Sequence, residues 1–513
     1  MQMTAKNHPS PSTFGWALLL LAMATAVLLR FVNLGTWPPG LYRDEAFNGL
    51  DGLRVLAGEF PLFFTTNNGR EPLYIYLTAL SVGLFGRSVL AVRLAAAVVG
   101  SLTTWLTYRL GQTWFGWRVG VLMAWLWAIT LWPVHLSRVG LRTIFLPAVL
   151  SLTFWLGTEA YRRQSAEGAS RWWLAAGVAY GFGFYTYLAI RFTPLLLLAL
   201  AVFLLWRGER RRVFAGVGWF LLGTAVTLLP LALFYSQNPD LLLGRTGQVS
   251  IFNPAINGGD FWGTLWRQLG RAFGLFVWRG DTILRHNPAG RPLFDWLMAV
   301  PFLLGVVYCL RHWRRPAVTA VLLWTIIMLG PTILAEDAPH FLRGVGILPA
   351  ALFFPALGLN WLWQWTRLPQ TVRGGLITLL MAGSLWLTVR DYVNYSQQPD
   401  TAFLFEAGAR ELAESINAED GGTAVYLDLW FWDESSQKGW ASIPFLTDLS
   451  QVQLYRPENS LPPAAAGQPT SLYAWPYGDL EFVPRLFADQ AVVMVENGRL
   501  SRGDLEPEPY SLY

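Results

Sequence analysis

The sequence predicts an all-α polytopic membrane protein with a small α/β domain at its C-terminal end. Of its 513 residues, 53% are hydrophobic and only 14% are charged, whereas soluble domains carry about 25% charged residues. Tryptophan is abundant, with 27 residues, as expected where aromatic side chains gather at membrane interfaces. Hydrophobic segments long enough for spans recur up to residue 390 and not beyond it.

The distribution of charge indicates two domains in two environments. The stretch from Asp391 to the C-terminus has 19 acidic and 6 basic residues, a balance of −13. The rest of the chain has 14 acidic and 32 basic residues, a balance of +18. We therefore expect a membrane domain over residues 1–392 and a soluble domain over residues 393–513.

The hydrophobic segments predict about twelve membrane spans, since each is near the length that crosses a bilayer. The first span is long and has no small-residue cleavage site after it, so we expect it to be retained. The predicted spans are 14–34, 72–86, 88–110, 117–133, 143–160, 172–189, 191–206, 213–235, 293–311, 317–335, 341–365 and 374–390.

Arginine-rich loops predict the sidedness of these spans, because short basic loops remain in the cytoplasm. Loops of this kind occur at 161–163, 207–212 and 311–315. These loops predict a multi-pass plasma-membrane protein in which the long loop 236–292 and the C-terminal domain are extracytoplasmic. Twelve crossings are inconsistent with an inner N-terminus and an outer tail, so one segment between 72 and 135 is expected not to span.

Local patterns predict structure outside the spans. Within the first loop, residues 35–71, apolar residues at helical spacing predict an interfacial helix over 46–57. In the tail, the patterns predict a helix over Ala402–Ile416 and strands at Thr423–Leu427, Val452–Tyr455 and Ala491–Val495.

Acidic residues in the first loop are the first candidates for catalysis. A carboxylate of Asp44 or Glu45, held at a membrane surface, can accept the proton of an attacking hydroxyl. The alternative is that Asp44 caps a helix, a common position for aspartate. Arg70 and Glu71 close the same loop, where an arginine can bind a phosphate leaving group or extend along the membrane interface as an ordinary cation.

Further basic residues lie in turns that are predicted to be extracytoplasmic. Arginine on that side opposes the usual trend, so either a phosphate partner or a different topology is needed to explain it. A cluster of acids, histidine and arginine at 336–343 could bind phosphate or a metal, although a lone histidine such as His340 is more often an ordinary polar surface residue. The candidates for phosphate binding are Arg138, Arg142, Arg191, His340 and Arg343.

Several other classes of function are excluded or unsupported. Cys309 is the only cysteine, so an intrachain disulfide and a cysteine metal site are impossible. The chain has no Walker loop, HExxH or GxSxG motif. Its basic charge is spread over membrane loops instead of one soluble face, which does not indicate a nucleic-acid partner.

The motifs together resemble GT-C-fold glycosyltransferases, in particular the group of protein O-mannosyltransferases and the aminoarabinose transferase that modifies lipid A. The resemblance covers about residues 14–370. It rests on a first span followed by an Asp-Glu loop and then a charged pair before Pro-Leu. The matching stretches are Asp44-Glu45, Arg70-Glu71-Pro72-Leu73, Phe85-Gly86, Val92-Arg93, Thr104–Leu110, and Arg343 before Leu348-Pro349.

This resemblance implies sugar transfer from a polyprenyl-phosphate donor to a hydroxyl of a protein or lipid acceptor, with inversion at the sugar carbon. It implies that Asp44 is the base and that the charged pair lies near the donor phosphate. The aminoarabinose transferase has Glu-Lys where this chain has Arg70-Glu71, so the role of Arg70 does not carry over directly. Whether a divalent cation is needed differs across the family.

A transporter or flippase of a lipid-linked sugar is the alternative function. Transporters usually place ionisable groups inside their spans, near the middle of the membrane. In this chain the acidic residues are nearly absent from the predicted spans and gather in loops. That distribution favours chemistry at the membrane surface over translocation.

Overall fold

The computed structural model describes residues 12–163, 168–433, 435–455, 469–474, 496–500 and 508–512. These residues form two compact units. Unit 1 contains the described residues within 1–32, 61–74 and 96–393, and unit 2 contains those within 33–60, 75–95 and 394–513. The second unit therefore combines the C-terminal residues with most of the first loop and the segment that follows it.

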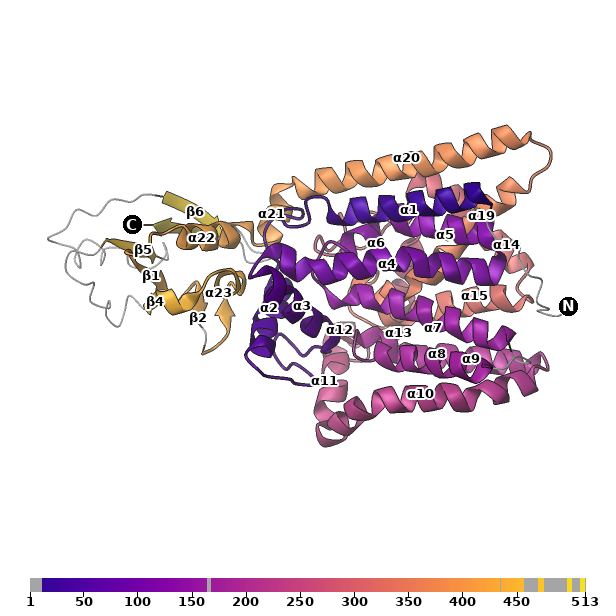
Figure 1. Ribbon diagram of the computed structural model, residues 1–513, viewed down its shortest axis with the longest axis horizontal. Helices are drawn as coiled ribbons and strands as arrows, with labels where there is room; N and C mark the ends of the chain where they lie inside the picture. The colour runs from indigo at the N-terminus through magenta and orange to yellow at the C-terminus, as the bar shows by residue number, and fades with distance from the viewer. Residues whose placement is uncertain are drawn as a thin grey trace. The chain divides into compact units, whose positions relative to one another are not determined.

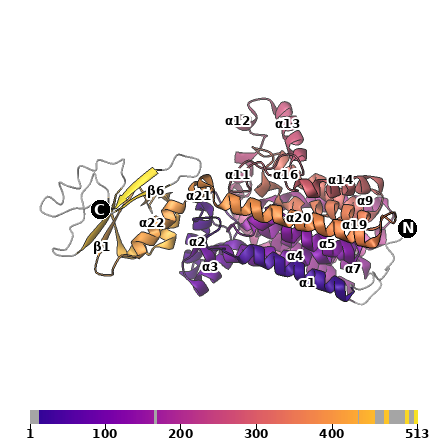
Figure 2. The ribbon, with the colours of Figure 1, turned by 90° about the horizontal axis from the view of Figure 1, so that it is seen from above.

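Unit 1 is helical, and its long helices run alongside one another (Figure 1). The chain passes between the units inside α3 (Leu73–Phe85) and α4 (Val89–Phe115). Figure 2 shows α12 and α13 standing out to one side of the other unit 1 helices. The remaining helices of unit 1 are α1 (Thr13–Phe31), α5 (Trp117–Ile129), α6 (Leu131–Leu136), η1 (Arg142–Ile144), α7 (Phe145–Arg162), α8 (Ala169–Gly183), η2 (Leu188–Phe192), α9 (Thr193–Trp206), α10 (Arg210–Gln237), α11 (Pro239–Val249), α12 (Pro254–Asn257), α13 (Phe261–Gly274), α14 (Trp296–Arg311), α15 (Pro316–Met328), α16 (Gly330–Ile333), α17 (Phe341–Gly344), η3 (Val345–Ile347), α18 (Leu348–Ala351), α19 (Phe353–Trp363) and α20 (Gln370–Ser396).

Eight helical stretches of the described chain are long and apolar enough to cross a membrane. Shorter apolar helices lie at α3, α5 and α14. The eight stretches are Thr13–Phe31, Val89–Phe115, Arg142–Arg162, Leu188–Trp206, Arg210–Gln237, Pro316–Ile333, Phe341–Trp363 and Gln370–Ser396.

The predicted span 72–86 coincides with a short apolar helix, α3. Helix α3 has 13 residues, a rise of about 20 Å at 1.5 Å per residue, against a hydrocarbon core of about 30 Å. The other short apolar helices, α5 and α14, pack along α1 and α19 of unit 1, whereas α3 belongs mostly to unit 2. Helix α5 also has 13 residues and α8 has 15, so length does not single out α3, and the number of crossings stays a prediction.

Small residues allow the helices of unit 1 to approach closely. A Cβ on Gly177 of α8 would clash with the carbonyl oxygen of Phe220 in α10, and one on Gly223 of α10 would clash with the carbonyl oxygen of Leu174. Glycines at such contacts bring two backbones together and increase van der Waals contact, which is the main attraction between helices in a membrane. Helices α8 and α10 therefore form a tight pair.

A buried arginine donates hydrogen bonds to the backbone carbonyl groups at the break between α5 and α6. Thr130 is extended and interrupts the helical hydrogen-bond ladder, which frees carbonyl groups just before it. The guanidinium of Arg30, on α1, donates to the carbonyl oxygens of Trp127 (2.9 Å) and Ala128 (3.3 Å) and to the Ser137 hydroxyl (3.1 Å). These bonds fix the start of the turn that carries Arg138 and Arg142.

Unit 2 contains a mixed sheet with helices packed against it. The strand order is β4-β1-β5-β7-β6, in which β4, β1 and β5 are parallel and β7 is antiparallel to both β5 and β6. The remaining elements of unit 2 are α2 (Arg43–Leu56), α21 (Pro399–Leu404), α22 (Ala407–Asn417), β1 (Ala424–Asp428), β2 (Trp432–Asp433), β3 (Lys438–Gly439), α23 (Ser442–Leu446), η4 (Leu449–Gln451), β4 (Val452–Tyr455), β5 (Thr470–Ala474), β6 (Glu496–Leu500) and β7 (Glu508–Leu512).

Two of the predicted strands are confirmed and the predicted tail helix is corrected. Strands β1 and β4 coincide with the predicted segments to within one residue, and the strand predicted at 491–495 lies outside the described residues. The predicted helix over 402–416 is instead divided into α21 and α22, because Glu406 adopts a left-handed backbone with φ 55°. A non-glycine residue in this region ends a helix.

Helix α2 confirms the predicted helix of the first loop, and its setting at a membrane interface stays a prediction. Its apolar face packs inside unit 2, where Ala46 and Phe47 share a core with Trp432 and Phe445. A Cβ at Gly49 would clash with the Phe445 ring. The first part of the apolar stripe of α2 is therefore buried against residues from the C-terminal part of the chain, whereas Leu56 at its far end is exposed.

Candidate active site

The first candidate residue, Asp44, lies in the first turn of α2. The helix begins at Arg43, and both Asp44 and Glu45 fall within its first turn. Carboxylates are favoured there because the helix dipole is positive at its N-terminus. Asp44 is partly exposed, whereas Glu45 is fully buried. The two adjacent acids therefore stand in different environments.

Glu45 and Arg93 form a buried clamp within unit 2. Arg93 donates to both carboxylate oxygens of Glu45, from Nε to Oε1 (2.8 Å) and from Nη2 to Oε2 (3.0 Å). Both side chains are 0% exposed. The backbone N–H of Tyr42 also donates to Glu45 Oε2 (3.1 Å), so the clamp holds the point at which α2 begins.

The other donors of Arg93 bind the chain that leads into α2. Its guanidinium donates to the carbonyl oxygens of Leu34 (3.2 Å), Pro38 (2.8 Å) and Gly40 (3.1 Å). All five N–H groups of the guanidinium are thereby used on one segment, and a buried charge needs such pairing. The clamp fixes both the entry to α2 and its first turn, and so it fixes the backbone that presents Asp44.

A second ion pair lies in unit 1, between Glu71 and Arg142. Arg142 Nε donates to Glu71 Oε2 (2.8 Å), and its guanidinium carbon lies 5.7 Å from the centre of the Tyr187 ring. Arg191 stacks over the Tyr235 ring at 5.8 Å. Tyr235 lies within electrostatic range of Glu71, Arg142 and Arg191. Unit 1 thus brings three predicted residues together around one tyrosine.

Arg70 and Arg138 are buried, and their hydrogen bonds organise the surrounding chain. Arg70 is 1% exposed and donates to the Thr66 hydroxyl at 2.8 Å. Arg138 is 2% exposed and donates to the carbonyl oxygens of Leu29 and Val32, each at 2.7 Å. Leu29 and Val32 lie at the C-terminal end of α1, where carbonyl groups lack helical partners.

His340 and Arg343 lie together at the start of α17. The His340 ring caps this helix by accepting from the backbone N–H of Arg343, and Arg343 pairs with Glu336 at 2.9 Å. His340 is 7% exposed. The residues of the predicted cluster at 336–343 therefore contact one another within a single turn. The His340 side chain also belongs to a second polar group.

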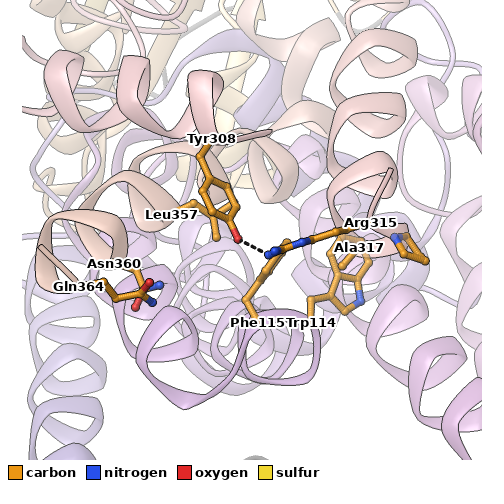
Figure 3. A pocket seen from close by; sticks show the side chains of 9 residues that line it. Trp114, Phe115, Tyr308, Arg315, Ala317, Leu357, Asn360 and Gln364 are labelled. Carbon is orange, nitrogen blue, oxygen red and sulfur yellow. Dashed lines mark hydrogen bonds between the residues drawn. The ribbon is translucent and has the colours of Figure 1, made fainter. Parts of the chain in front are cut away.

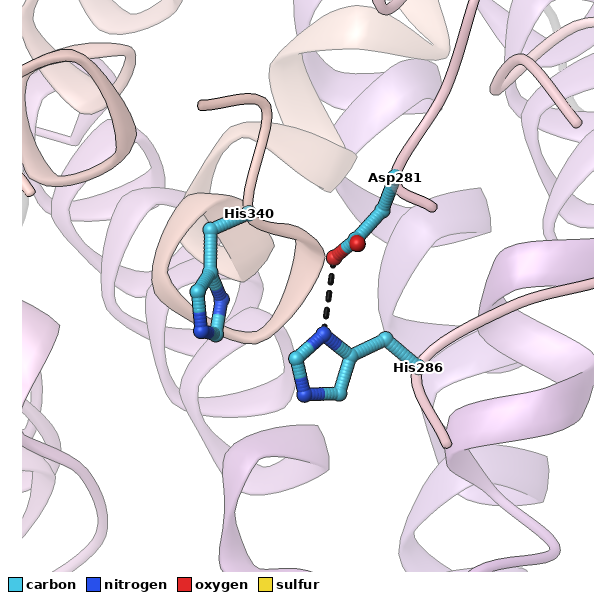
Figure 4. A group of neighbouring side chains, drawn as sticks. All are labelled: Asp281, His286 and His340. Atoms are coloured by element: carbon cyan, nitrogen blue, oxygen red, sulfur yellow. Dashed lines mark hydrogen bonds and ion pairs between the residues drawn. The ribbon is translucent and has the colours of Figure 1, made fainter. Parts of the chain in front are cut away.

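That group consists of Asp281, His286 and His340, from two segments far apart in the sequence (Figure 4). The His286 Nδ1–H donates to Asp281 Oδ2 (2.7 Å), and the two imidazole rings lie 4.5 Å apart. Asp281 also accepts from the backbone N–H groups of Phe341 and Ile283. These bonds tie the loop before α14 to the start of α17.

Burial and neighbouring charges shift the pKa of each member of this group. The pKa of His286 lies well below its usual value because of burial, with repulsion from Arg285, His135 and Arg343 adding to the effect. Burial also lowers the pKa of His340 and raises that of Asp281. Both imidazoles are thus held neutral at physiological pH.

The same group could hold a divalent cation. One ligand atom from each of the three residues lies within 4.8 Å of the others, and two imidazoles with one carboxylate suit zinc. Arg285 Nε donates to His286 Nε2 (2.9 Å), so this nitrogen would bind a metal only if Arg285 withdrew. The neutral imidazoles favour ligation because a ligand nitrogen must be unprotonated.

The sequence predicted some of these arrangements and missed others. It identified Asp44, the Glu71 and Arg142 region and the turn containing His340. It did not assign a role to Arg93, Asp281 or His286. A signal existed for Arg93, since an arginine inside an apolar segment needs a buried partner. Asp281 and His286 stand in a long loop, where spacing alone does not indicate a pairing with residue 340.

Comparisons with known proteins identify the class of fold. Residues 69–235 match the family model described as dolichyl-phosphate-mannose-protein mannosyltransferase. Among solved structures, the chain is similar to ArnT from Cupriavidus metallidurans bound to undecaprenyl phosphate, with TM-score 0.60, 16% identity and coverage of 98% of both chains. A search of curated proteins finds no match.

A second similar structure is the oligosaccharyltransferase of Archaeoglobus fulgidus, solved in complex with zinc and sulfate. The TM-score is 0.56 with 15% identity, over 85% of this chain and 62% of that one. The chain therefore has the GT-C fold of membrane glycosyltransferases, as the sequence predicted. The comparisons support an enzyme of the mannosyltransferase and aminoarabinose transferase group, and they give no support to the transporter alternative.

Proposed function

We propose that this protein transfers a sugar from a polyprenyl-phosphate donor to a hydroxyl group of an extracytoplasmic acceptor, with Asp44 as the base. The observation that carries the proposal is the buried Glu45–Arg93 clamp, which fixes the first turn of α2 and leaves Asp44 partly exposed on it. The GT-C fold and the match of residues 69–235 to a mannosyltransferase family model support it.

The proposed reaction is a single displacement at the sugar carbon. The acceptor oxygen forms a bond to the sugar carbon while the bond from that carbon to the phosphate oxygen breaks, which inverts the configuration. The hydroxyl proton passes to the Asp44 carboxylate, since a positioned base makes a weak nucleophile reactive. The lipid phosphate leaves with the bonding electron pair, and cationic groups stabilise its growing negative charge.

Arg142 and Arg191 are the proposed phosphate ligands. Arg142 keeps 22% of its side chain exposed although it is paired with Glu71, and Arg191 is also partly exposed. Arginine binds phosphate in a bidentate manner, through two parallel hydrogen bonds. We propose that Glu71 orients Arg142, and that Arg70 and Arg138 act through the backbone that they hold.

Glu45 has a positioning role in this proposal. Both of its carboxylate oxygens accept hydrogen bonds from Arg93, and it is 0% exposed, so it cannot take a proton from an acceptor without breaking the clamp. The acceptor is a protein or a glycolipid hydroxyl, and unit 2 is proposed to be extracytoplasmic. Both assignments follow from the sequence and the family resemblance.

A transfer assay with purified protein tests the function. Detergent-solubilised protein is incubated with a radiolabelled polyprenyl-phosphate sugar and extracts of envelope glycolipids or proteins. We expect label to leave the lipid and appear on an acceptor, which transport cannot produce without a membrane. Asp44→Asn should abolish this transfer, while the matched control Asp420→Asn, at an exposed position of unit 2, should not. Full transfer by Asp44→Asn would exclude Asp44 as the base.

A further inference from the structure

A polar pocket of about 320 Å³, open to solvent on the side where Arg315 and Gln364 are exposed, lies at the arginine-rich end of unit 1 (Figure 3). It is bounded by the C-terminal ends of α4 and α19, by α14, and by the start of α15. Its polar lining consists of Arg315, Tyr308, Asn360 and Gln364, and its apolar walls include Trp114 and Phe115. We call this space the head chamber.

The head chamber offers hydrogen-bond donors and no acid. Arg315 Nη1 donates to the Tyr308 hydroxyl at 3.0 Å, which leaves the phenolic hydrogen and the other guanidinium N–H groups to donate. The amides of Asn360 and Gln364 add N–H₂ groups. Within the described part of the chain no acidic side chain lines the chamber or pairs with Arg315. This chemistry suits an anion such as a phosphodiester.

A larger apolar chamber of about 620 Å³, the tail chamber, shares its wall with the head chamber. Trp114, Pro316 and Ala317 line both spaces. The tail chamber extends between α7, α8, α9 and α10, and its walls are almost entirely aliphatic and aromatic, without a charged residue among the described side chains. A polar head space beside an apolar tail space is complementary to an amphiphile.

Among the described acids, Glu159 and Glu209 are each paired with an arginine other than Arg315. Glu159 of α7 is already engaged, by Arg163 at 3.3 Å and by the Thr113 hydroxyl at 3.3 Å. Arg311 and Arg314 precede Arg315 in the sequence, in a loop predicted to face the cytoplasm. Anionic lipids of a cytoplasmic leaflet are attracted to such clusters.

The head chamber is distinct from the proposed donor-phosphate residues. Trp114 donates to the Thr158 hydroxyl of α7 at 2.9 Å, whereas Arg142 lies directly before the start of α7. Residues 142 and 158 are separated by about 24 Å along a helical axis, at 1.5 Å per residue. A phosphate in the head chamber is thus near the opposite end of α7 from Arg142.

We propose that unit 1 binds one anionic phospholipid, with its phosphodiester in the head chamber and an acyl chain in the tail chamber. The site is independent of the proposed sugar transfer. Arg315 binds the phosphodiester, and Asn360 and Gln364 bind its remaining oxygens. The apolar chamber beside it receives the acyl chain. Without that chain, the aliphatic walls would be uncovered.

Native mass spectrometry of the delipidated full-length protein tests this site. The protein is titrated with phosphatidylglycerol, with phosphatidylcholine of the same acyl chains, and with inorganic phosphate. We expect one phosphatidylglycerol to be retained more tightly than phosphatidylcholine, with inorganic phosphate unable to replace it. Arg315→Ala should weaken phosphatidylglycerol retention about fivefold, the loss expected for one arginine near anionic lipid.

Two further variants make the result decisive. Arg314 stacks on Trp313 at 5.3 Å and does not line the chamber, so Arg314→Ala should retain lipid as the wild type does. Gly157 lines the tail chamber and has room for a side chain, so Gly157→Leu should weaken both lipids while leaving Arg315 intact. If Arg315→Ala does not fold, Asn360→Ala gives the same test of the head chamber.

Several results would overturn the proposal. These are equal retention of the two lipids, equal losses in Arg314→Ala and Arg315→Ala, or displacement of phosphatidylglycerol by inorganic phosphate, which would indicate a simple anion site. Stoichiometric displacement by polyprenyl phosphate would assign the chambers to the donor. Sugar transfer by the same variants is measured as well. This measurement distinguishes assignment of the chambers to the donor from a failure of the proposed function.

Discussion

Two carboxylate–arginine pairs, one in each unit, have the same chemistry and different surroundings. Glu45 and Arg93 in unit 2 are both 0% exposed. In unit 1, Glu71 is 5% exposed and Arg142 is 22% exposed. The distance between nitrogen and oxygen is 2.8 Å in both pairs, so distance does not distinguish them.

The difference lies in what else each arginine binds. Arg93 uses its remaining donors on three backbone carbonyl groups, which leaves none for a ligand. Arg142 keeps 22% of its side chain exposed and stands beside Tyr187. An ion pair of the first kind holds a backbone in place, and one of the second kind can present a cation to an anionic substrate. The following predictions test this division.

The largest expected effect is on catalysis at the residue that the buried clamp supports. Asp44→Asn removes the base and keeps the size of the side chain, so transfer should fall by about 10²–10⁴-fold, the usual contribution of a general base. The thermal midpoint should stay near that of the wild type. Initial rates with labelled donor measure the effect, and a loss below tenfold would indicate that another group accepts the proton.

Breaking the buried pair should cause the largest loss of stability. Arg93→Ala leaves the Glu45 carboxylate buried without its partner, which costs about 3–5 kcal/mol in comparable pairs. Chemical denaturation of the purified protein measures the free energy of unfolding. Replacing both residues with apolar side chains of similar size should recover much of this loss. If Arg93→Ala were as stable as the wild type, the clamp would not hold the start of α2.

The parts of the fold that could be predicted are those with a strong periodic signal. Long apolar segments gave the spans, and alternating β-formers gave β1 and β4. The twelve predicted spans correspond to eight long apolar helices and to shorter ones such as α3, a difference in length that hydropathy alone does not reveal. The helix over 402–416 was wrong because the left-handed turn at Glu406 depends on tertiary contacts, including Arg43 at 3.7 Å.

The candidate site was predictable only where the sequence carries adjacent signals. Asp44 was identified by its loop and by a family pattern, and its role stays a prediction. The distinction between Asp44 and Glu45 required the structure, since burial of Glu45 is caused by Arg93, 48 residues later in the sequence. The same holds for Asp281, which meets His340 only because α17 begins beside the loop before α14.

A third polar pair, His286 with Asp281, should make the stability of unit 1 depend on pH. Burial lowers the pKa of His286 and His340 in the folded state. Their contribution is therefore present above the unfolded value near 6.5 and is lost as the pH falls below it. Between pH 6.5 and 5.5 the loss should be about 1 kcal/mol for each histidine.

Thermal unfolding of the metal-free protein at several pH values measures this dependence. Asp281, with its raised pKa, opposes part of the trend, so the histidines are tested directly. The double variant His286→Asn with His340→Asn should unfold with a flatter pH profile than the wild type. An unchanged slope would mean that other groups control the pH dependence.

The smallest expected effect tests the exposed pair itself. Arg142→Ala should lower kcat/KM about tenfold through the loss of one charge-assisted contact to phosphate, and it should cost less stability than Arg93→Ala. Glu71→Gln keeps the guanidinium and should have a smaller effect on transfer. Arg163→Ala, at the opposite end of α7, serves as a control with unchanged kinetics.

The ratio of the two effects decides what kind of pair Glu71 and Arg142 form. If Arg142 binds the donor phosphate, its loss should exceed the loss in Glu71→Gln, and Arg142→Lys should recover part of the activity because lysine retains the charge. If the pair only holds the backbone, the two variants should be equally damaging and lysine should not help. That second result would place Glu71 and Arg142 in the same class as Glu45 and Arg93, and it would leave Arg191 as the proposed phosphate ligand of unit 1.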